Sequence, residues 1–229
     1  MNFSQMIIAC AELAQANPER PICQVSIVVG PQNVIVAGTD GHRAYRAVFA
    51  HHACGDLMPP PGHWTIPTAP LPKLAPYAWQ AELDGAVLDM RASTDKGNRT
   101  KGSKARDTRV TLHSKPSDLL STWAQLDGAD TAELPHPAAW TLSEALEPLV
   151  RDANVTITSG SVVRTPWSAQ LCEGAPSHAR VLVNAGYLED ALDLAGAMAT
   201  IHIPTTDALA PIKVTGDAFT ALVMPRGRR

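Results

Sequence analysis

A short polar stretch, residues 39–43, reads Thr-Asp-Gly-His-Arg and lies between two apolar, β-branched runs. Asp-Gly between such runs predicts a tight turn, because glycine tolerates a positive φ and aspartate can bond its own backbone. A turn needs only these two residues. Thr39, His42 and Arg43 add a hydroxyl, an imidazole and a guanidinium at the same corner, where desolvation is costly unless something binds them. The stretch is therefore either a plain surface turn or a binding corner.

Catalysis and metal binding are alternative interpretations of the polar residues. Asp40 with His42 suggests acid–base chemistry, and Ser4 or Cys10 suggests a nucleophile, but these spacings supply no catalytic arrangement. His-His-Ala-Cys at 51–54 lacks a second pair of metal ligands at a useful spacing. We expect no catalytic residue, no metal and no cofactor. A small DNA-modifying enzyme that uses the His-rich stretch remains a rival.

The composition is that of a globular protein with an uneven charge distribution. The chain has 229 residues, 45% hydrophobic and 18% charged, with a net charge of −3. This length allows one large domain or two domains of about 115 residues each. Six of the 19 basic residues lie between positions 96 and 109 beside one acid, Asp107, so the remaining chain is acidic. That segment is either a nucleic-acid contact or a solvated loop.

The cysteines and the apolar runs indicate a cytoplasmic protein. The four cysteines are scattered and form no Cys-x-x-Cys pair, which is typical of reduced thiols. No apolar run approaches the roughly 18 residues of a membrane span. Near the N-terminus, two short stretches mimic signal-peptide cleavage sites, but no Lys or Arg precedes them.

The binding corner lies among predicted strands that follow a helix. Apolar spacing predicts an amphipathic helix over 3–17, which Pro18 ends. Residues 69–78 have helical spacing, but three prolines favour a short or distorted helix. Strands are predicted at 22–29, 33–38, 43–50, 64–68, 86–91 and 109–113.

The second half repeats the order helix, strands, helix, strands. Residues 114–139 are rich in proline and predict a link between halves, with a helical turn around 119–126. Helices are predicted at 142–150 and 186–197, and strands at 154–158, 161–164, 169–173, 180–184, 200–204, 212–216 and 218–224. The repeated order predicts an α+β fold of two similar domains, 1–125 with the linker 114–139 and then 135–229.

Four collinear stretches resemble the bacterial DNA polymerase III β sliding clamps. Residues 39–43 resemble the TDGHR motif of the clamp's middle domain, and residues 183–192 resemble the segment that opens the last domain's final helix. Residues 206–212 and 222–226 match later segments of the last domain. The resemblance implies two DNA-clamp domains, each with two helices packed on antiparallel sheet. It also implies a ring around duplex DNA that acts as a processivity factor in DNA replication and is not an enzyme.

The resemblance also implies a pocket for peptides carried by the DNA polymerase and the clamp loader. Met and Leu would form its adaptable apolar floor, while His, Arg and backbone groups would orient the peptide. Ala44 stands where the family usually has a larger apolar residue, and Arg226 where an apolar residue is common. Carried over by motif, the pocket comprises Thr39, Gly41, His42, Arg43, Ala44, Asn184, Tyr187, Leu209, Pro211, Met224, Pro225 and Arg226.

The length of the chain implies a homotrimer. A ring of six clamp domains needs three chains of two domains each, joined head to tail. DNA contacts would be non-specific and made to phosphates by basic residues. The expected contacts are Arg20, Lys73, Arg99, Lys101, Lys104 and Arg151. The rival of another class is a clamp-like decoy that binds a clamp, loader or polymerase without encircling DNA.

Overall fold

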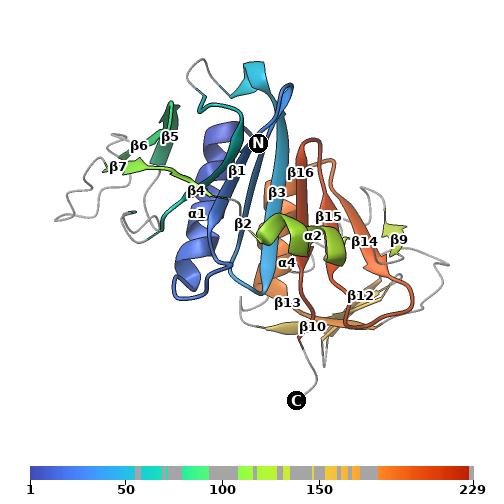
Figure 1. Ribbon diagram of the computed structural model, residues 1–229. Coiled ribbons are helices and arrows are strands. Elements are labelled where there is room, and N and C mark those ends of the chain that lie inside the picture. Colours follow the sequence, from blue (N-terminus) through green and yellow to red (C-terminus); the bar gives the residue numbers. More distant parts are fainter. Residues whose placement is uncertain are drawn as a thin grey trace. The chain divides into compact units, whose positions relative to one another are not determined.

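The computed structural model shows an α+β protein with antiparallel sheets, which confirms the predicted fold class (Figure 1). The structure describes residues 1–54, 58–68, 71, 79–92, 108–115, 118–127, 131–134, 146, 153–158, 161–164, 167–170 and 180–226. The chain divides into two compact units. The first contains Met1–Gly41 and Arg46–Ser121, and the second contains His42–Tyr45 and Thr122–Arg229.

Helix α1 (Phe3–Ala16) forms the core of the first unit with the strands beneath it. Asn2 caps the helix: its side chain accepts a hydrogen bond from the Gln5 N–H, and the Gln5 side chain accepts one from the Asn2 N–H, each satisfying a free donor. One face of the helix is fully buried, including Met6, Ile7 and Cys10. The spacing of apolar residues in the sequence predicted both this helix and its buried face.

Two sheets complete the first unit. The order of the larger is β8-β4-β1-β2-β3, and the order of the smaller is β5-β6-β7. A short 3₁₀ helix, His51–Ala53, follows β3. The strands are β1 (Val25–Val29), β2 (Asn33–Thr39), β3 (Arg43–Ala50), β4 (Gly62–Ile66), β5 (Trp79–Asp84), β6 (Val87–Ala92), β7 (Thr108–Thr111) and β8 (His113–Ser114).

Strand β2 approaches α1 so closely that only glycine fits at one position. A Cβ on Gly38 would lie 2.6 Å from the Cβ of Cys10 and 2.9 Å from its carbonyl oxygen. Because backbone atoms of the helix cannot move aside easily, the missing side chain sets the spacing between helix and sheet. This packing holds the end of β2, where the binding corner begins.

Helix α4 (Ala185–Ala195) lies against β13, β15 and β16 in the second unit (Figure 1). Two sheets are again present within this unit, with orders β16-β15-β14-β9 and β12-β11-β10-β13. Helix α2 (Leu119–Leu126) contains the point where the first unit ends. The strands are β9 (Thr131–Leu134), β10 (Asn154–Ile157), β11 (Ser161–Arg164), β12 (Trp167–Gln170), β13 (Val181–Asn184), β14 (Thr200–Pro204), β15 (Ile212–Thr215) and β16 (Phe219–Val223).

The structure differs from the expectations mainly between the halves. Residues 114–139 are more than a link, because they contain the end of β8, helix α2 and strand β9. Strand β5 was not predicted. The helix expected over 142–150 lies outside the described residues except for Leu146, which is helical and buried. The distorted helix expected over 69–78 also lies outside them, apart from Leu71.

The thiols of the described cysteines are free. Burial raises the pKa of the Cys10 thiol far above its usual range and that of Cys54 to about 11. Burial, and then the charge of Asp40, raise the pKa of Cys23. These thiols are therefore held protonated and poorly nucleophilic. None of the helices in the described part of the chain is long and apolar enough to cross a membrane.

Candidate functional site

The predicted turn is present at the end of β2. The N–H of Gly41 donates to Oγ1 of Thr39 over 3.0 Å, and Gly41 has a φ of 86°, in the left-handed region that favours glycine. The carbonyl of Asp40 accepts a hydrogen bond of 2.7 Å from Nδ2 of Asn17, the C-cap of α1. Thr39 and Asp40 are buried. Their role in the first unit is to shape the turn.

Arg20, one of the expected DNA contacts, lies beside this turn. A Cβ on Gly41 would be 2.6 Å from Nη1 of Arg20, so the guanidinium occupies the space that a side chain would need. Gly41 is therefore favoured for its φ, whereas the flexible Arg20 side chain could move aside from a larger residue. The Arg20 side chain remains exposed at this position.

His42 connects the corner to the end of the chain. The N–H of Met224 donates to the carbonyl of His42 over 2.8 Å. Met224 directly follows β16, whose last residue, Val223, pairs with Ile212 at the start of β15. Pro211 precedes Ile212, so Pro211 and Met224 lie at the same end of the sheet. The structure thus brings together three segments that the sequence analysis assigned to one pocket.

Arg43 lies between an aromatic ring and a carboxylate of α4. Its guanidinium carbon is 4.6 Å from the centre of the Tyr187 ring, within the range of a cation–π contact. The same guanidinium forms an ion pair with Asp190, and the two side chains are only 16% and 24% exposed. The Tyr45 ring lies 5.8 Å away. Partial exclusion of water makes these contacts stronger than they would be on an open surface.

The imidazole of His42 stacks on the same tyrosine. The His42 and Tyr187 ring centres are 6.2 Å apart with an angle of 24° between their planes. Tyr187 is held in place by the start of α4, where the buried Asn184 caps the helix and its Oδ1 accepts from the Tyr187 N–H over 3.0 Å. The result is a flat wall of His42, Tyr187 and Arg43, which can contact planar or apolar groups and donate hydrogen bonds.

The other predicted pocket residues differ in exposure. Ala44 is 8% exposed and Pro211 is buried, so both contribute mainly to packing. Leu209 is 67% exposed, in a turn where its N–H donates to the Asp207 carboxylate over 2.8 Å. Pro225 is half-buried and Arg226 is exposed, and the Arg226 N–H donates to the Leu182 carbonyl over 2.7 Å.

Two residues of the cluster, Asp190 and Tyr45, were not predicted. The sequence analysis did not include the acids of the last helix in the pocket, whereas the structure pairs Asp190 with Arg43. Asp190 lies three residues after Tyr187, so the two side chains share one face of α4. This spacing could have indicated from the sequence that Asp190 lies near the pocket. Tyr45 packs its ring on Phe219 of β16, with centres 5.5 Å apart.

Most expected DNA contacts cannot be placed. Lys73, Arg99, Lys101, Lys104 and Arg151 lie outside the described residues. The end of the basic segment is visible as Arg109 on β7. Its guanidinium donates to both oxygens of Asp89, over 2.7 and 2.9 Å, and these hydrogen bonds hold the pKa of Asp89 below its ordinary value. That arginine is therefore matched by an acid.

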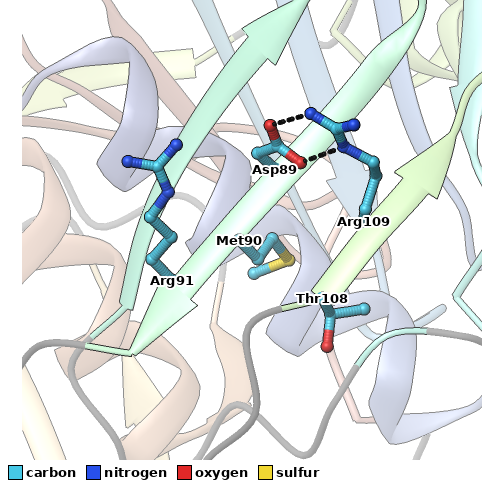
Figure 2. A pocket seen from close by; sticks show the side chains of 5 residues that line it. All are labelled: Asp89, Met90, Arg91, Thr108 and Arg109. Carbon is cyan, nitrogen blue, oxygen red and sulfur yellow. Dashed lines mark hydrogen bonds and ion pairs between the residues drawn. The ribbon is translucent and has the colours of Figure 1, made fainter.

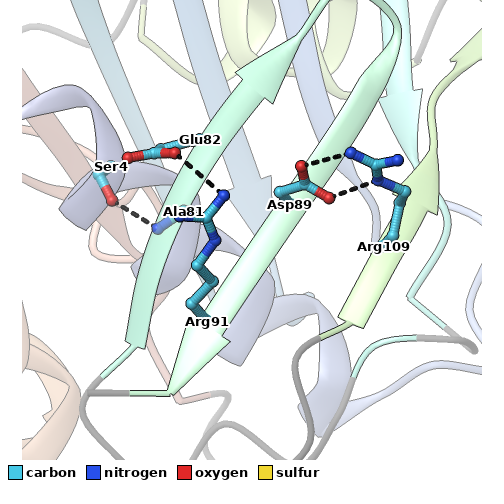
Figure 3. A network of polar contacts seen from close by, with 6 residues as sticks. All are labelled: Ser4, Ala81, Glu82, Asp89, Arg91 and Arg109. Carbon is cyan, nitrogen blue, oxygen red and sulfur yellow. Dashed lines mark hydrogen bonds and ion pairs between the residues drawn. The ribbon is translucent and has the colours of Figure 1, made fainter. Parts of the chain in front are cut away.

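A small open cavity of about 240 Å³ lies beside this pair in the first unit (Figure 2). Its walls come from β6 and β7, and Arg91 on β6 lies 3.8 Å from a carboxylate oxygen of Glu82 on β5 (Figure 3). Opposite charges thus alternate across the exposed face of this sheet. The residues that line the cavity are Asp89, Met90, Arg91, Thr108 and Arg109.

The described part of the chain contains no group of three or more His, Cys, Asp or Glu side chains that could hold a metal ion. His51 of the His-rich stretch instead places Nε2 2.7 Å from the carbonyl of Gly30. The stretch therefore has a local structural contact in the fold.

Solved structures of β clamps share this fold. No known protein-family profile matches the sequence, and no curated protein matches it. The β chain of DNA polymerase III from Streptococcus pneumoniae is 16% identical, with a TM-score of 0.61, over 100% of this chain and 64% of that chain. The Helicobacter pylori β clamp bound to a DNA ligase peptide is 13% identical, with a TM-score of 0.58, over 99% and 64%.

The DnaN sliding clamp of Bartonella birtlesii bound to griselimycin is 15% identical, with a TM-score of 0.60, over 98% and 63% of the two chains. The chain therefore has the fold of bacterial β clamps and spans about 64% of the length of the solved clamps it matches. This confirms, at the level of the fold, the resemblance seen in the sequence.

Proposed function

We propose that this chain, which has the fold of about two thirds of a bacterial β clamp, is a sliding clamp. It encircles duplex DNA as a homotrimeric ring in the cytoplasm and tethers the replicative DNA polymerase through a peptide-binding pocket. It has no catalytic role of its own. A clamp of this kind raises the processivity of a polymerase by keeping it at the template, and it receives both the polymerase and the clamp loader at one site.

The hydrogen bond between the Met224 N–H and the His42 carbonyl carries this proposal. It joins the two segments that most resemble the family's peptide pocket, although they are almost the whole chain apart. Around this bond the second unit presents the flat wall of His42, Arg43 and Tyr187, with half-buried Met224 beside it. Apolar surface with a few fixed polar groups is the usual composition of a ligand site.

We propose that a partner's peptide contacts this wall and the adjoining residues. The flexible Met224 side chain can adapt to different apolar groups, and exposed Leu209 is available to a ligand. The proposed contacts in the second unit are His42, Arg43, Ala44, Asn184, Tyr187, Leu209, Pro211, Met224, Pro225 and Arg226. Thr39 and Gly41 of the first unit form the turn that precedes them.

The edges of the sheets support head-to-tail assembly. Among the described strands, β7 is the last of its sheet, as is β12 in the second unit. At the opposite edge of the β7 sheet, the outward N–H of Ala81 on β5 is already bonded to Oγ of Ser4 over 2.8 Å (Figure 3). Unpaired strand edges are templates for pairing with another chain. We therefore propose that β7 of one protomer pairs with β12 of the next, and that three such contacts close a ring.

A peptide titration tests the pocket. The DNA ligase peptide seen on the Helicobacter pylori clamp is labelled with a fluorophore and titrated with the chain, and fluorescence anisotropy is recorded. Saturable binding that an excess of the unlabelled peptide displaces, and that His42→Ala weakens, supports the pocket. Absence of binding at concentrations up to about 1 mM contradicts the pocket. A Kd of about 1 mM corresponds to a binding free energy near −4 kcal/mol.

A primer-extension assay separates a working clamp from a decoy. The chain is added to a bacterial replicative polymerase and clamp loader on primed circular DNA at increasing salt. Longer products per binding event support the proposed function. Inhibition of a bacterial clamp without any stimulation supports the decoy. Loss of retention on linear DNA, but not on circular DNA, is the sign of encirclement.

A further inference from the structure

We infer that Asp190 is a positioning residue of the peptide site, acting through Arg43. The inference rests on the proposed function, because it concerns how the same wall is held. Asp190 lies one helical turn after Tyr187, so that its carboxylate and the tyrosine ring project from the same face of α4. Arg43 reaches this face from β3 and contacts both groups.

The three side chains form a small ordered assembly. The carboxylate of Asp190 forms an ion pair with the guanidinium of Arg43, which lies 4.6 Å from the centre of the Tyr187 ring. The opposite edge of the assembly is His42, stacked on the same ring. An arginine on an open surface samples many rotamers, and fixing it costs conformational entropy. Here the ion pair with Asp190 already fixes the guanidinium in the free protein, so that less of this entropy is lost when a ligand binds.

The charge of Asp190 also determines what the wall offers to a ligand. The ion pair with Asp190 balances the charge of the partly buried Arg43, so the wall presents mainly ring faces. Without that charge, the guanidinium would lose this ion pair and would be held less firmly beside the ring. A preorganised wall binds more tightly because less order must be imposed on binding. Asp190 is thus expected to affect peptide affinity without touching the peptide.

The test is a double-mutant cycle measured with the labelled ligase peptide on the full chain. Asp190→Asn is expected to weaken binding about tenfold, within the range of coupling between contacting residues. Asp190→Glu keeps the charge and is expected to restore most of the affinity. Asp193→Asn, an exposed acid on the same helix, is the matched control and should bind like the wild type.

The cycle distinguishes a positioning role from a general structural one. If Asp190 acts through Arg43, Asp190→Asn has no further effect when Arg43 is already Gln. Equal losses in both backgrounds would overturn the inference, as would wild-type affinity of the single variant. If Asp190→Asn alone does not fold, Arg43→Gln and the double variant are compared, since neither contains the arginine that Asp190 pairs with. Failure of the wild type to bind the peptide would instead overturn the proposed function.

Discussion

The guanidinium of Arg43 lies over the ring of Tyr187 and is held there by Asp190 of the same helix. Arg43 comes from a stretch that reads as a simple hairpin turn in the sequence, whereas Tyr187 belongs to the last helix. The contact therefore turns two separate motifs into one surface. His42 completes this surface. Its imidazole stacks on the Tyr187 ring, and its backbone carbonyl accepts a hydrogen bond from the Met224 N–H.

Removal of the His42 side chain should weaken peptide binding and leave the assembly intact. In His42→Ala the backbone carbonyl that accepts the Met224 N–H remains, so only the stacked imidazole is lost. Truncating a central side chain of a binding site typically costs tenfold or more, and we expect about that loss here. Met224→Ala should have a similar effect. Peptide anisotropy measures both.

His52→Ala, an exposed residue in the first unit, is the control and should bind like the wild type. The mass of each variant in solution is measured in parallel. If His42→Ala or Met224→Ala dissociates the assembly, the corner is structural and our assignment of the pocket is wrong.

Proline at Thr111 should block assembly without unfolding the first unit. The Leu112 N–H donates to the Ala86 carbonyl, so the N–H of the preceding residue points away from β6. Thr111→Pro therefore removes an outward donor of edge strand β7 while it spares the bonds to β6. We expect monomers in sedimentation velocity, with little change in the thermal midpoint.

Thr111→Val keeps the backbone N–H and is the matched control, which should assemble like the wild type. An unchanged mass for the proline variant would show that β7 is not at the protomer contact.

Alanine at Gly38 should destabilise the first unit. Its Cβ would lie 2.6 Å from the Cβ of Cys10, so α1 must shift away from β2. Forcing an extra carbon into a close-packed core costs about 1–3 kcal/mol. Urea unfolding followed by circular dichroism measures the loss. Gly85→Ala is the comparison variant without a steric clash, because a Cβ there meets nothing within 4 Å. Its destabilisation reports only the cost of placing alanine at a positive φ. A free energy of unfolding for Gly38→Ala equal to the wild type would contradict this packing.

Acid should destabilise the fold through His202 on β14. Burial, and then the charge of Lys213, lower the pKa of this imidazole below its usual value of 6.5. Its Nε2 lies 3.1 Å from Oγ1 of Thr215, while Glu133 and Asp127 oppose the shift. Because the folded state resists protonation, this contribution is complete above pH 6.5 and is lost as the pH falls through the lowered pKa.

The free energy of unfolding in urea is compared between about pH 8 and about pH 5 for the wild type and for His202→Gln. The amide of glutamine can replace the contact with Thr215 but does not titrate. We expect a smaller pH-dependent loss in the variant. Parallel pH profiles for the two proteins would rule out this role of His202.

The regular elements were largely predictable from residue patterns. The apolar stripe of α1 and the turn at Gly41 were both visible in the sequence, because each follows from local geometry. Strand β5 could have been predicted, since Trp79, Ala81 and Leu83 alternate with polar residues before Asp84 and Gly85. Strand β9 has only four residues before Pro135 and gives too short a pattern.

The residues of the candidate site could be grouped from the sequence only through their resemblance to known motifs. Nothing in the spacing of the sequence connects His42 to Met224 or Arg43 to Asp190, because both contacts depend on how distant strands and helices pack. The role of Asp190 was missed for the same reason. An acid on a helix is normally a solvated residue, and only the folded chain shows the arginine that it faces.

The mass of the chain in solution tests the central claim most directly. Sedimentation equilibrium is measured at several concentrations across the micromolar range at moderate salt. A closed ring of three chains predicts about 73 kDa, three times the 24.3 kDa of one chain, and no larger species at higher concentration. A constant mass of 24.3 kDa throughout that range would contradict a ring that encircles DNA.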